Sequence, residues 1–307
     1  MFEKCLNEKY EMNNKKLASN KILIATLDVL GVTQLMRETS NESLEAIAAK
    51  IKDAFEQAKT CVKNRINGLM DRTSTPQKLK EIIIDHVFNA TVHFHDFSDT
   101  IVMSCDTNKI NFDAIKEKLI PTDTWDITKR SLTDAAVRLF GIQVTHSVNE
   151  LFIAGFPVRG CVDVGTVYMA DGLVVGKAYV DALKLSETLD FSGVVVTDAA
   201  LDFCKEHENG DIIGTTFTIA DLWVPTTGKE NFHRYKCLNW LDVSSEVSNC
   251  KPFTDDNDWQ QLLYEKFAAN GKSMTASALR KLANTENTIR AFILQNKASH
   301  ENQRAKK

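Results

Sequence analysis

The stretch Lys21-Ile22-Leu23-Ile24-Ala25-Thr26-Leu27-Asp28 decides how the rest of the chain is interpreted. It is an apolar run of the length of a buried strand, and it ends on a carboxylate. Gly31 follows after a short gap. Thr39 and Glu42 then have capping-box spacing, and Gly68 is placed to end a helix. Apolar residues between them recur at three-and-four spacing, which predicts a long helix over one face of a sheet: Leu44, Ile47, Ile51, Phe55, Ala58 and Val62.

A second pair of carboxylates lies between two further strand-like runs. The run from Val87 to His95 and the run from Ile101 to Cys105 flank the segment Asp96-Phe97-Ser98-Asp99-Thr100. Apolar runs on either side of a short polar segment are typical of a β-hairpin. The sequence therefore predicts a hairpin whose tip carries Asp96 and Asp99.

The rest of the chain alternates between strand-like and helical patterns, which gives an α/β or α+β fold. Hairpins among the strands favour α+β with a mixed or antiparallel sheet, and Asp171-Gly172 predicts a tight turn. We expect a polar arm over 1–19, one catalytic domain over 20–245 and a helical extension over 246–307. The remaining expected elements are a loop at 70–80, a short helix and turn within 107–129, helices at 130–149, 177–189, 256–269 and 273–295, and strands at 158–165, 193–197 and 237–243.

The amino-acid composition indicates the cellular compartment and the classes of binding partner that we expect. Apolar residues make up 43% of the 307 residues and charged residues 25%, and the net charge of −4 indicates no nucleic-acid footprint. No apolar run approaches the roughly 20 residues that span a bilayer, and the N-terminus is too polar for a secretory signal. We expect a cytoplasmic protein that binds neither nucleic acid nor membrane.

Two residue types that often hold metal do not predict a zinc site here. The seven cysteines contain no CxxC pair, so we expect small buried hydrophobic residues in a reducing compartment. His93 and His95 share a strand face without further ligands nearby. Trp223 and Trp240 are expected in the core or in an interface.

Asp28 and Asp99 are the candidate metal ligands. Carboxylates that converge from neighbouring strands repel each other, which raises one pKa unless a cation joins them. Mg²⁺ suits such a pair, because it takes one or two protein carboxylates together with waters and substrate phosphates. Two metals held in this way activate an attacking oxygen and neutralise a leaving group. Each aspartate taken singly also fits an ordinary turn or helix cap, and that alternative stays open.

Four segments occur in an order that is similar to one known family. They are Ile24-Ala25-Thr26-Leu27-Asp28-Val29-Leu30-Gly31-Val32, Phe97-Ser98-Asp99-Thr100-Ile101-Val102, Val158-Arg159-Gly160-Cys161-Val162-Asp163-Val164-Gly165, and Gly176 to Leu185. They resemble the first and second metal motifs, the strand from Arg to Gly, and the glycine-led helix of the class III nucleotidyl cyclases. The resemblance covers about residues 20–200.

The resemblance implies a ferredoxin-like βαββαβ core that dimerises head to tail, with active sites at the subunit interface. By position, Asp28 and Asp99 become ligands of a two-metal Mg²⁺ or Mn²⁺ site, with the Val29 carbonyl as a third ligand. The metal activates the ribose 3′-hydroxyl, which attacks the α-phosphate and expels pyrophosphate. Arg159 and His95 become substrate-binding candidates.

The glycine-led helix departs from the purine cyclases, which place an Asn on it and an Arg four residues later. Gly176 sets the register and puts Val180 and Lys184 at those positions. Lys184 keeps the charge but not the bidentate fork, and it is the candidate catalytic residue. A solvated helix lysine is the alternative for Lys184, and Asp181 or Glu187 are the other residues that could line the cleft.

The base-reading positions also differ, since they hold His95 and Leu173 where adenylate cyclases have Lys and Asp. A site without those polar groups argues against ATP and GTP. These features resemble the bacterial Pycsar pyrimidine cyclases, which make cyclic UMP or cyclic CMP to activate a separate effector against phage. We expect UTP rather than CTP, on family frequency alone. The alternatives are an adenylate or guanylate cyclase, or an inactive homologue that binds nucleotide or serves dimerisation.

Overall fold

The computed structural model describes residues 21–32, 35, 41–72, 77–97, 99–118, 125–170, 173–207, 218–227, 232–241 and 259–305. The expected arm over 1–19, the Thr39 cap, the Asp171-Gly172 turn and the domain boundary near 245 lie outside these residues.

The described strands form a seven-stranded mixed sheet and a separate two-stranded ribbon. The sheet has the order β2-β3-β1-β4-β7-β9-β8, and the ribbon is β5-β6. Only β4 and β7 pair in parallel among these strands. The strands are β1 (Ile22–Val29), β2 (Val92–Phe97), β3 (Thr100–Cys105), β4 (Val158–Gly165), β5 (Val167–Ala170), β6 (Leu173–Gly176), β7 (Gly193–Val196), β8 (Ile219–Pro225) and β9 (Phe232–Leu238).

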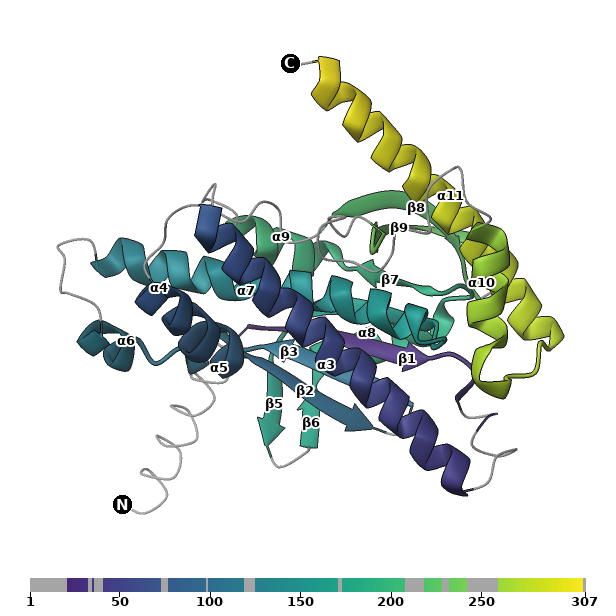
Figure 1. Cartoon of the computed structure of the whole chain (residues 1–307), viewed down its shortest axis with the longest axis horizontal. Helices are drawn as coiled ribbons and strands as arrows, with labels where there is room; N and C mark the ends of the chain where they lie inside the picture. The colour runs from purple at the N-terminus through teal and green to yellow at the C-terminus, as the bar shows by residue number, and fades with distance from the viewer. Residues whose placement is uncertain are drawn as a thin grey trace, which may run out of the picture.

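The described helices lie on both faces of this sheet and at both of its ends. Short helices cluster around α4 and α6 at one end, and α10 and α11 lie at the opposite end, where β1 stops (Figure 1). The α-helices are α3 (Asn41–Arg72), α4 (Gln77–Ile82), α5 (Asn89–Thr91), α6 (Phe112–Lys118), α7 (Trp125–Ile153), α8 (Lys177–Thr188), α9 (Asp198–Glu206), α10 (Trp259–Ala268) and α11 (Ala276–Ala305). A π-helix (Ile83–Phe88) and two 3₁₀ turns (Thr107–Lys109, Ala269–Gly271) complete them.

The first four sheet strands and two long helices make a ferredoxin-like βαββαβ core. In chain order the elements are β1, α3, β2, β3, α7 and β4, and the four strands lie in the order 2-3-1-4 across the sheet. This confirms the predicted α+β class, the mixed sheet and the core topology. Many unrelated activities use such a core, so function has to be argued from the site.

Alternation along β1 separates the two faces of the core. Leu23 and Leu27 belong to the main hydrophobic cluster, which includes residues of α3 and α7. Ile22 and Ile24 belong to a second, smaller cluster that contains Ala178 of α8 and residues of β5 and β6. Because successive side chains of a strand point to opposite faces, Asp28 lies on the α8 side of the sheet.

The predicted strand from Val87 to His95 is wrong in its first half. Residues 83–91 are helical, and β2 begins only at Val92. Val87 is fully buried, and its carbonyl accepts a hydrogen bond from the Thr91 hydroxyl at 2.7 Å. A short apolar run fits a buried helix as well as a strand, and here burial beside α7 selects the helix.

Three further boundaries differ from the predictions. Helix α3 runs through Gly68 to Arg72, because this glycine has no positive φ with which to end it. In the predicted loop at 70–80, residues 70–72 belong to α3 and residues 77–80 belong to α4. Strand β9 ends at Leu238 rather than continuing to 243, since the chain turns so that Trp240 packs on Phe152 at 5.0 Å between ring centroids.

The predicted environments of the tryptophans and cysteines are mostly confirmed. Trp240 is buried, whereas Trp223 is 69% exposed on β8 and is not a core residue. The free cysteines 105, 161, 204 and 237 are buried, and Cys61 is partly buried. No group of three potential metal-binding side chains occurs among the described residues. No helix in the described part of the chain is both long and apolar enough to cross a bilayer.

Candidate active site

Asp28 and Asp99 line one cavity at the end of β1. Asp28 is the register partner of Thr100 on β3 and of Arg159 on β4. The backbone N–H of Val29 donates to the Asp99 carbonyl at 2.9 Å, which ties the hairpin tip to the end of β1. The cavity has a volume of about 260 Å³. The predicted convergence of the two carboxylates is therefore present in the fold.

Arg159 closes one side of this cavity and holds Asp28. Its Nε donates to Oδ2 of Asp28 at 2.6 Å, and its Nη1 donates to the Glu187 carbonyl at 2.9 Å. The side chains of Arg159 and Asp28 are mostly buried, with exposed fractions of 19% and 15% respectively. The next residue is Gly160, where a Cβ would lie 2.4 Å from the Thr26 carbonyl oxygen. The Arg-Gly pair therefore lets β4 approach β1 closely while the guanidinium reaches the cavity.

The turn after β1 forms the floor of the cavity. Gly31 has a φ of +82°, which favours glycine over residues with a side chain. The N–H of Leu30 donates to the Pro157 carbonyl at 2.9 Å, and the carbonyl of Gly31 accepts from Leu35 at 3.1 Å. These bonds fix the direction in which the chain leaves Asp28.

The groups around Asp28 shift its pKa in opposite directions. Burial raises the pKa of the Asp28 carboxyl above its usual value, and the Arg159 guanidinium opposes this through charge and hydrogen bond. The Asp99 carboxylate raises the pKa of Asp28 further, whereas Lys281 lowers it. The two aspartates are thus close enough to repel, and a cation placed between them relieves that repulsion.

The donor set fits a divalent metal that arrives with a phosphate substrate. Asp28, Asp99 and Glu187 line the cavity, but no group of three metal-binding side chains occurs among the described residues, so the protein supplies fewer oxygens than an all-protein metal cage. Mg²⁺ characteristically completes such a partial set with waters and substrate phosphates. Only Oδ2 of Asp28 is engaged by Arg159, so its second oxygen is available to a metal.

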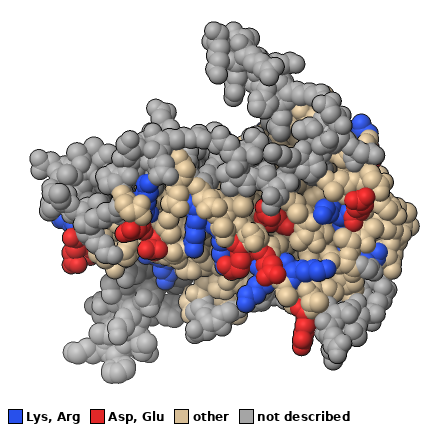
Figure 2. All heavy atoms as spheres, in the orientation of Figure 1, with Lys and Arg blue, Asp and Glu red and all other residues tan. Residues whose placement is uncertain are grey.

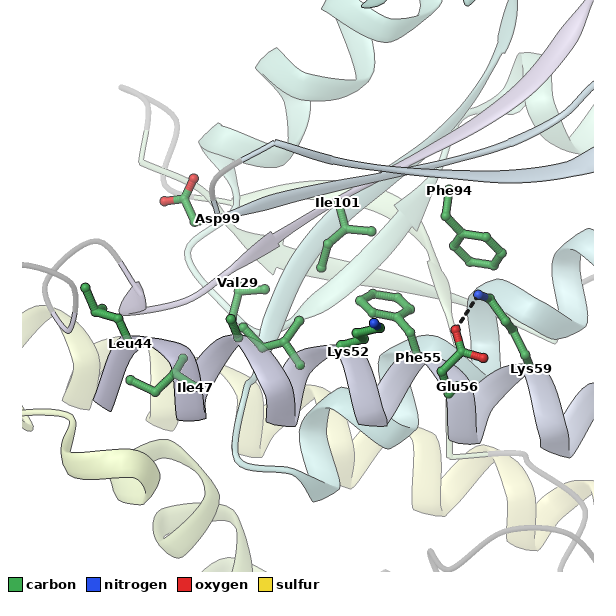
Figure 3. Close-up of a pocket in the computed structure, with 12 residues that line it drawn as sticks. Val29, Leu44, Ile47, Lys52, Phe55, Glu56, Lys59, Phe94, Asp99 and Ile101 are labelled. Carbon is green, nitrogen blue, oxygen red and sulfur yellow. Dashed lines mark hydrogen bonds and ion pairs between the residues drawn. The ribbon is translucent and has the colours of Figure 1, made fainter. Parts of the chain in front are cut away.

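A second, larger cavity of about 600 Å³ lies between α3 and the β2–β3 hairpin (Figure 3). Its lining is mostly apolar and includes Phe55 and Phe94. Lys59 reaches into it, with its Nζ 4.7 Å from the centroid of the Phe94 ring and 2.7 Å from the Glu56 carboxylate. Val29 and Asp99 also border the first cavity, which Asp28 and Asp99 line together and which we call the acidic cavity. No motif marks this cavity in the sequence, because residues of the helix and of the hairpin meet only in the folded chain.

Helix α8 presents two different faces near the site. Leu183 and Glu187 line the acidic cavity, as the alternative for Glu187 anticipated. Val180 and Lys184 are exposed on the neighbouring face, so Lys184 does not line the cavity of its own chain. Asp181 instead forms an ion pair with Lys177.

His95 also lies outside the lining of the acidic cavity. It is half-buried on β2, opposite Val102 in the register of β3. Val102 lies in the α8-side cluster, so the cross-strand register places His95 on the same sheet face as Asp28. Leu173, the second base-reading position, is 55% exposed on β6.

Lys281 is a site residue that the sequence did not reveal. It belongs to α11, more than 250 residues after Asp28, and lines the cavity with both aspartates. No motif or spacing marks it in the sequence. Only the docking of the C-terminal helix brings it to the end of β1.

Comparisons with known proteins give structural likeness alone. No protein-family model matches the chain, and no curated protein matches it. One similar solved structure is the catalytic core of a rhodopsin-guanylyl cyclase with converted specificity in complex with ATPαS, at 10% identity and a TM-score of 0.34. The match covers 71% of this chain and 94% of that one.

Another similar structure is a bacterial light-regulated adenylyl cyclase, at 12% identity and a TM-score of 0.33. That match covers 72% of this chain and spans about half, 52%, of the other. With TM-scores this low, the fold assignment depends on the strand order described above.

Proposed function

We propose that this chain is a metal-dependent nucleotidyl cyclase that works as a homodimer. It converts a pyrimidine nucleoside triphosphate, UTP in preference to CTP, to the 3′,5′-cyclic monophosphate and pyrophosphate. The observation that carries the proposal is the single cavity shared by Asp28 and Asp99, beside Arg159, at the strand ends of a ferredoxin-like core. The choice of pyrimidine rests on the sequence resemblance, as does a role for the product as a messenger to a separate effector in bacterial antiphage defence.

In this proposal the two carboxylates bind the metal-triphosphate complex. Bound Mg²⁺ or Mn²⁺ supplies neutralisation of the phosphate charge and activation of the attacking hydroxyl. Asp28, Asp99 and the Val29 carbonyl are the ligands that the chain offers. The 3′-hydroxyl would lose its proton to solvent as its oxygen bonds to the α-phosphorus, while the bond from that phosphorus to the bridging oxygen breaks and pyrophosphate leaves.

Arg159 orients Asp28 and contacts phosphate. A guanidinium has five N–H donors, and the contacts from Nε to Asp28 and from Nη1 to the Glu187 and Leu189 carbonyls leave Nη2 to donate to an anion in the cavity. Its planar fork suits phosphate oxygens, and its burial strengthens these contacts. Catalysis then depends mainly on positioning and on charge neutralisation.

The homodimer supplies the group that the cavity of one chain lacks. Large apolar side chains are exposed on the ribbon and on the adjoining α8, at Tyr168, Leu173, Val175 and Val180. Exposed apolar side chains that gather on neighbouring elements mark an interaction surface. Lys184 lies one helical turn from Val180 on the same side of α8. A second copy bound to this surface would receive Lys184 at its own acidic cavity as the transition-state cation.

In the same homodimer, His95 and Leu173 would recognise the base of the nucleotide. His95 shares a sheet face with Asp28, and Leu173 is exposed on the ribbon that the proposed dimer would place against the second copy. A histidine can donate to or accept from a pyrimidine edge. A leucine offers no polar group that a purine would need.

A nucleotide screen tests the function. The purified protein is incubated with each of the four nucleoside triphosphates and Mn²⁺, and cyclic monophosphates are separated by chromatography. Cyclic product mainly from UTP or CTP supports the proposal. Product mainly from ATP or GTP would identify a purine cyclase with an unusual base site. No product from any of the four would leave a cyclase-like binding or dimerisation module.

A further inference from the structure

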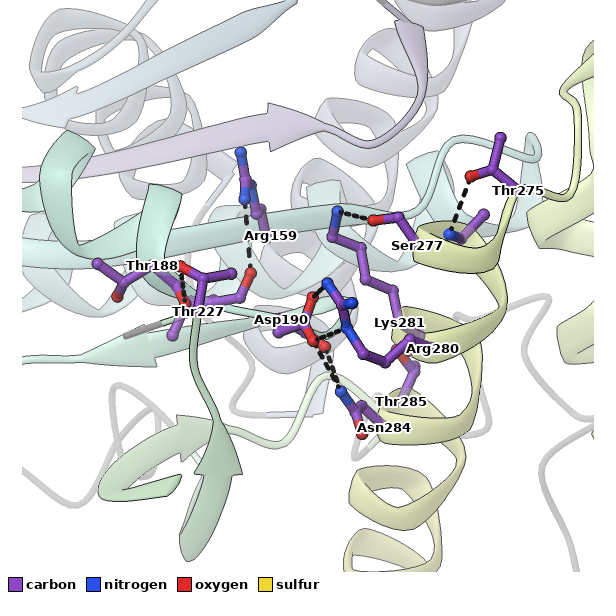
Figure 4. Close-up of polar contacts among 12 residues, drawn as sticks. Arg159, Thr188, Asp190, Thr227, Thr275, Ser277, Arg280, Lys281, Asn284 and Thr285 are labelled. Carbon is purple, nitrogen blue, oxygen red and sulfur yellow. Dashed lines mark hydrogen bonds and ion pairs between the residues drawn. The ribbon is translucent and has the colours of Figure 1, made fainter. Parts of the chain in front are cut away.

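The C-terminal helix α11 is anchored beside the acidic cavity by one buried carboxylate. Asp190, which follows α8, has only 7% of its side chain exposed. Arg280 donates to it from Nε and from Nη2, and Asn284 donates to its backbone carbonyl at 2.7 Å (Figure 4). Thr285 accepts from the Ser192 N–H at 2.8 Å. This set of bonds fixes both the position and the rotation of the helix.

That rotation directs Lys281 to the end of β1. Arg280 and Asn284 are four residues apart and share the face that contacts Asp190. Lys281 follows Arg280, and its side chain lines the acidic cavity together with Asp28 and Asp99. The lysine therefore reaches the site from a part of the chain outside the ferredoxin-like core.

The ammonium of Lys281 is close to the carboxylates without being paired to one. It donates to the Ser277 hydroxyl at 3.4 Å, and no carboxylate of the described residues lies within ion-pair distance of it. Arg159, in contrast, is committed to Asp28 by a direct bond. Burial lowers the pKa of Lys281, as does the positive charge of Arg159. Lys281 is thus a half-buried cation without a direct counter-ion among the described residues, in the cavity where the proposed function places a triphosphate.

We propose that Lys281 binds the phosphate chain of the nucleotide in the acidic cavity of its own protomer. This rests on the proposed function, since it names a further substrate-binding residue of that site. The in-cis cation complements Lys184, which the same proposal brings from the second copy. It also gives the C-terminal extension a role, because loss of α11 removes a phosphate ligand.

The test separates charge from packing. Lys281→Met keeps the aliphatic stem and removes the charge, and Lys281→Arg keeps the charge. The exposed lysine Lys205 on α9 gives the matched control Lys205→Met. Binding of inorganic tripolyphosphate with Mg²⁺ is measured by calorimetry at two salt concentrations. Kinetics are measured with the triphosphate that the screen identifies.

Lys281→Met is expected to weaken tripolyphosphate binding and raise KM about 10-fold, and to flatten the salt dependence of binding. Lys281→Arg is expected to stay within about threefold of the wild type. If Lys281→Met lowers the thermal midpoint, Lys281→Gln serves as a second charge-free variant.

Tripolyphosphate affinity and KM unchanged in folded Lys281→Met would overturn the proposal, as would a loss of kcat alone. The cyclase function would survive that result. Lys281-dependent tripolyphosphate binding in a protein that cyclises no nucleotide would support the lysine's role and refute the cyclase.

Discussion

Arg159 and Asp28 face each other across the β4–β1 pair, joined by a 2.6 Å bond from the guanidinium Nε to the carboxylate Oδ2. The bond holds one candidate metal ligand by one oxygen and leaves the other oxygen open. It also keeps a cation beside the carboxylate when no substrate is bound. A metal bound at the open oxygen would leave this ion pair in place, so Arg159 could orient Asp28 both with and without substrate.

Asp99 is expected to be indispensable for turnover and dispensable for folding. Asp99→Asn removes a negative charge from the cavity while keeping the shape of the side chain, so turnover should fall by about 10³-fold or more. The hairpin tip stays tied by the backbone bond from Val29 to the Asp99 carbonyl, which the substitution leaves intact. Cyclic nucleotide formation and circular dichroism measure the two effects. The control is Asp202→Asn, at an exposed residue of α9. Retained activity in Asp99→Asn would refute the metal assignment.

Arg159→Lys is expected to lower kcat/KM by about 10- to 100-fold, because an ammonium cannot span the contacts to Asp28 and to the Glu187 carbonyl at once. A forked pair far from the site provides the control. Arg234 donates from Nε and Nη2 to Asp221 on the exposed β8–β9 edge, and Arg234→Lys should leave the kinetics unchanged. Equal kinetics for both variants would remove Arg159 from the mechanism.

Lys184 is expected to act across the dimer interface, since it lies outside the cavity of its own chain. Lys184→Ala should depress kcat strongly, whereas Lys177→Ala on the same helix should not. Mixing inactive Lys184→Ala with inactive Asp99→Asn rebuilds one complete site per heterodimer. Subunit exchange of a twofold dimer then restores about a quarter of wild-type activity. A mixture that stays as inactive as its components would contradict a shared site.

Arg280 is expected to stabilise the docking of α11. Arg280→Ala leaves the buried Asp190 carboxylate with Asn284 as its remaining side-chain donor, and should lower the free energy of unfolding by more than the loss of an exposed ion pair does. Arg290 on the same helix pairs with the exposed Glu286 at i,i+4 and lies over the Trp259 ring, so Arg290→Ala should cost less than about 1 kcal/mol. Chemical denaturation measures both. Equal losses would mean that the Asp190 contacts do not anchor the helix.

Lys272 gives the stability a pH dependence above neutrality. Burial lowers the pKa of its ammonium to about 8, against 10.5 as the ordinary value for the unfolded chain. Between these pH values the unfolded chain holds a proton that the folded chain has lost, so stability rises with pH by up to about 1.4 kcal/mol per unit.

The contribution of Lys272 is absent in Lys272→Met. The difference in unfolding free energy between wild type and this variant should therefore change across pH 8 to 10 in favour of the wild type. Lys205→Met is the control. A constant difference across this range would show that the ammonium is not desolvated. The folded ammonium donates to the Gly155 carbonyl at 2.7 Å, which the same variant removes at every pH.

The distribution of surface charge bears on which ligands the protein can attract. Among the described residues, acidic and basic side chains are interspersed over the face seen in Figure 2, and neither sign dominates there. The net charge of −4 agrees with this. A polyanionic ligand therefore needs local help, which the proposed site would provide through Arg159, Lys281 and a bound metal.

The sequence by itself determined the core strands and the two aspartates. The segment Val158–Gly165 forms a strand at the predicted bounds, and the predicted run from Lys21 to Asp28 is a strand shifted by one residue, Ile22–Val29. Long apolar or alternating runs leave few other ways to bury their side chains. The spacing of the motifs also placed Asp28 and Asp99 at strand ends. Once these strands pair in the order of a ferredoxin-like core, the two carboxylates meet at one cavity.

Only the tertiary structure decided which residues of other elements reach that cavity. Residues 83–91 became helical because burial beside α7 outweighed their strand-like composition. Lys281 entered the site, and Lys184 was left on an outer face, because helix rotation is set by contacts such as Arg280 with Asp190. Local patterns specify which face of a helix is apolar, whereas the partner of its polar face depends on residues far away in the chain.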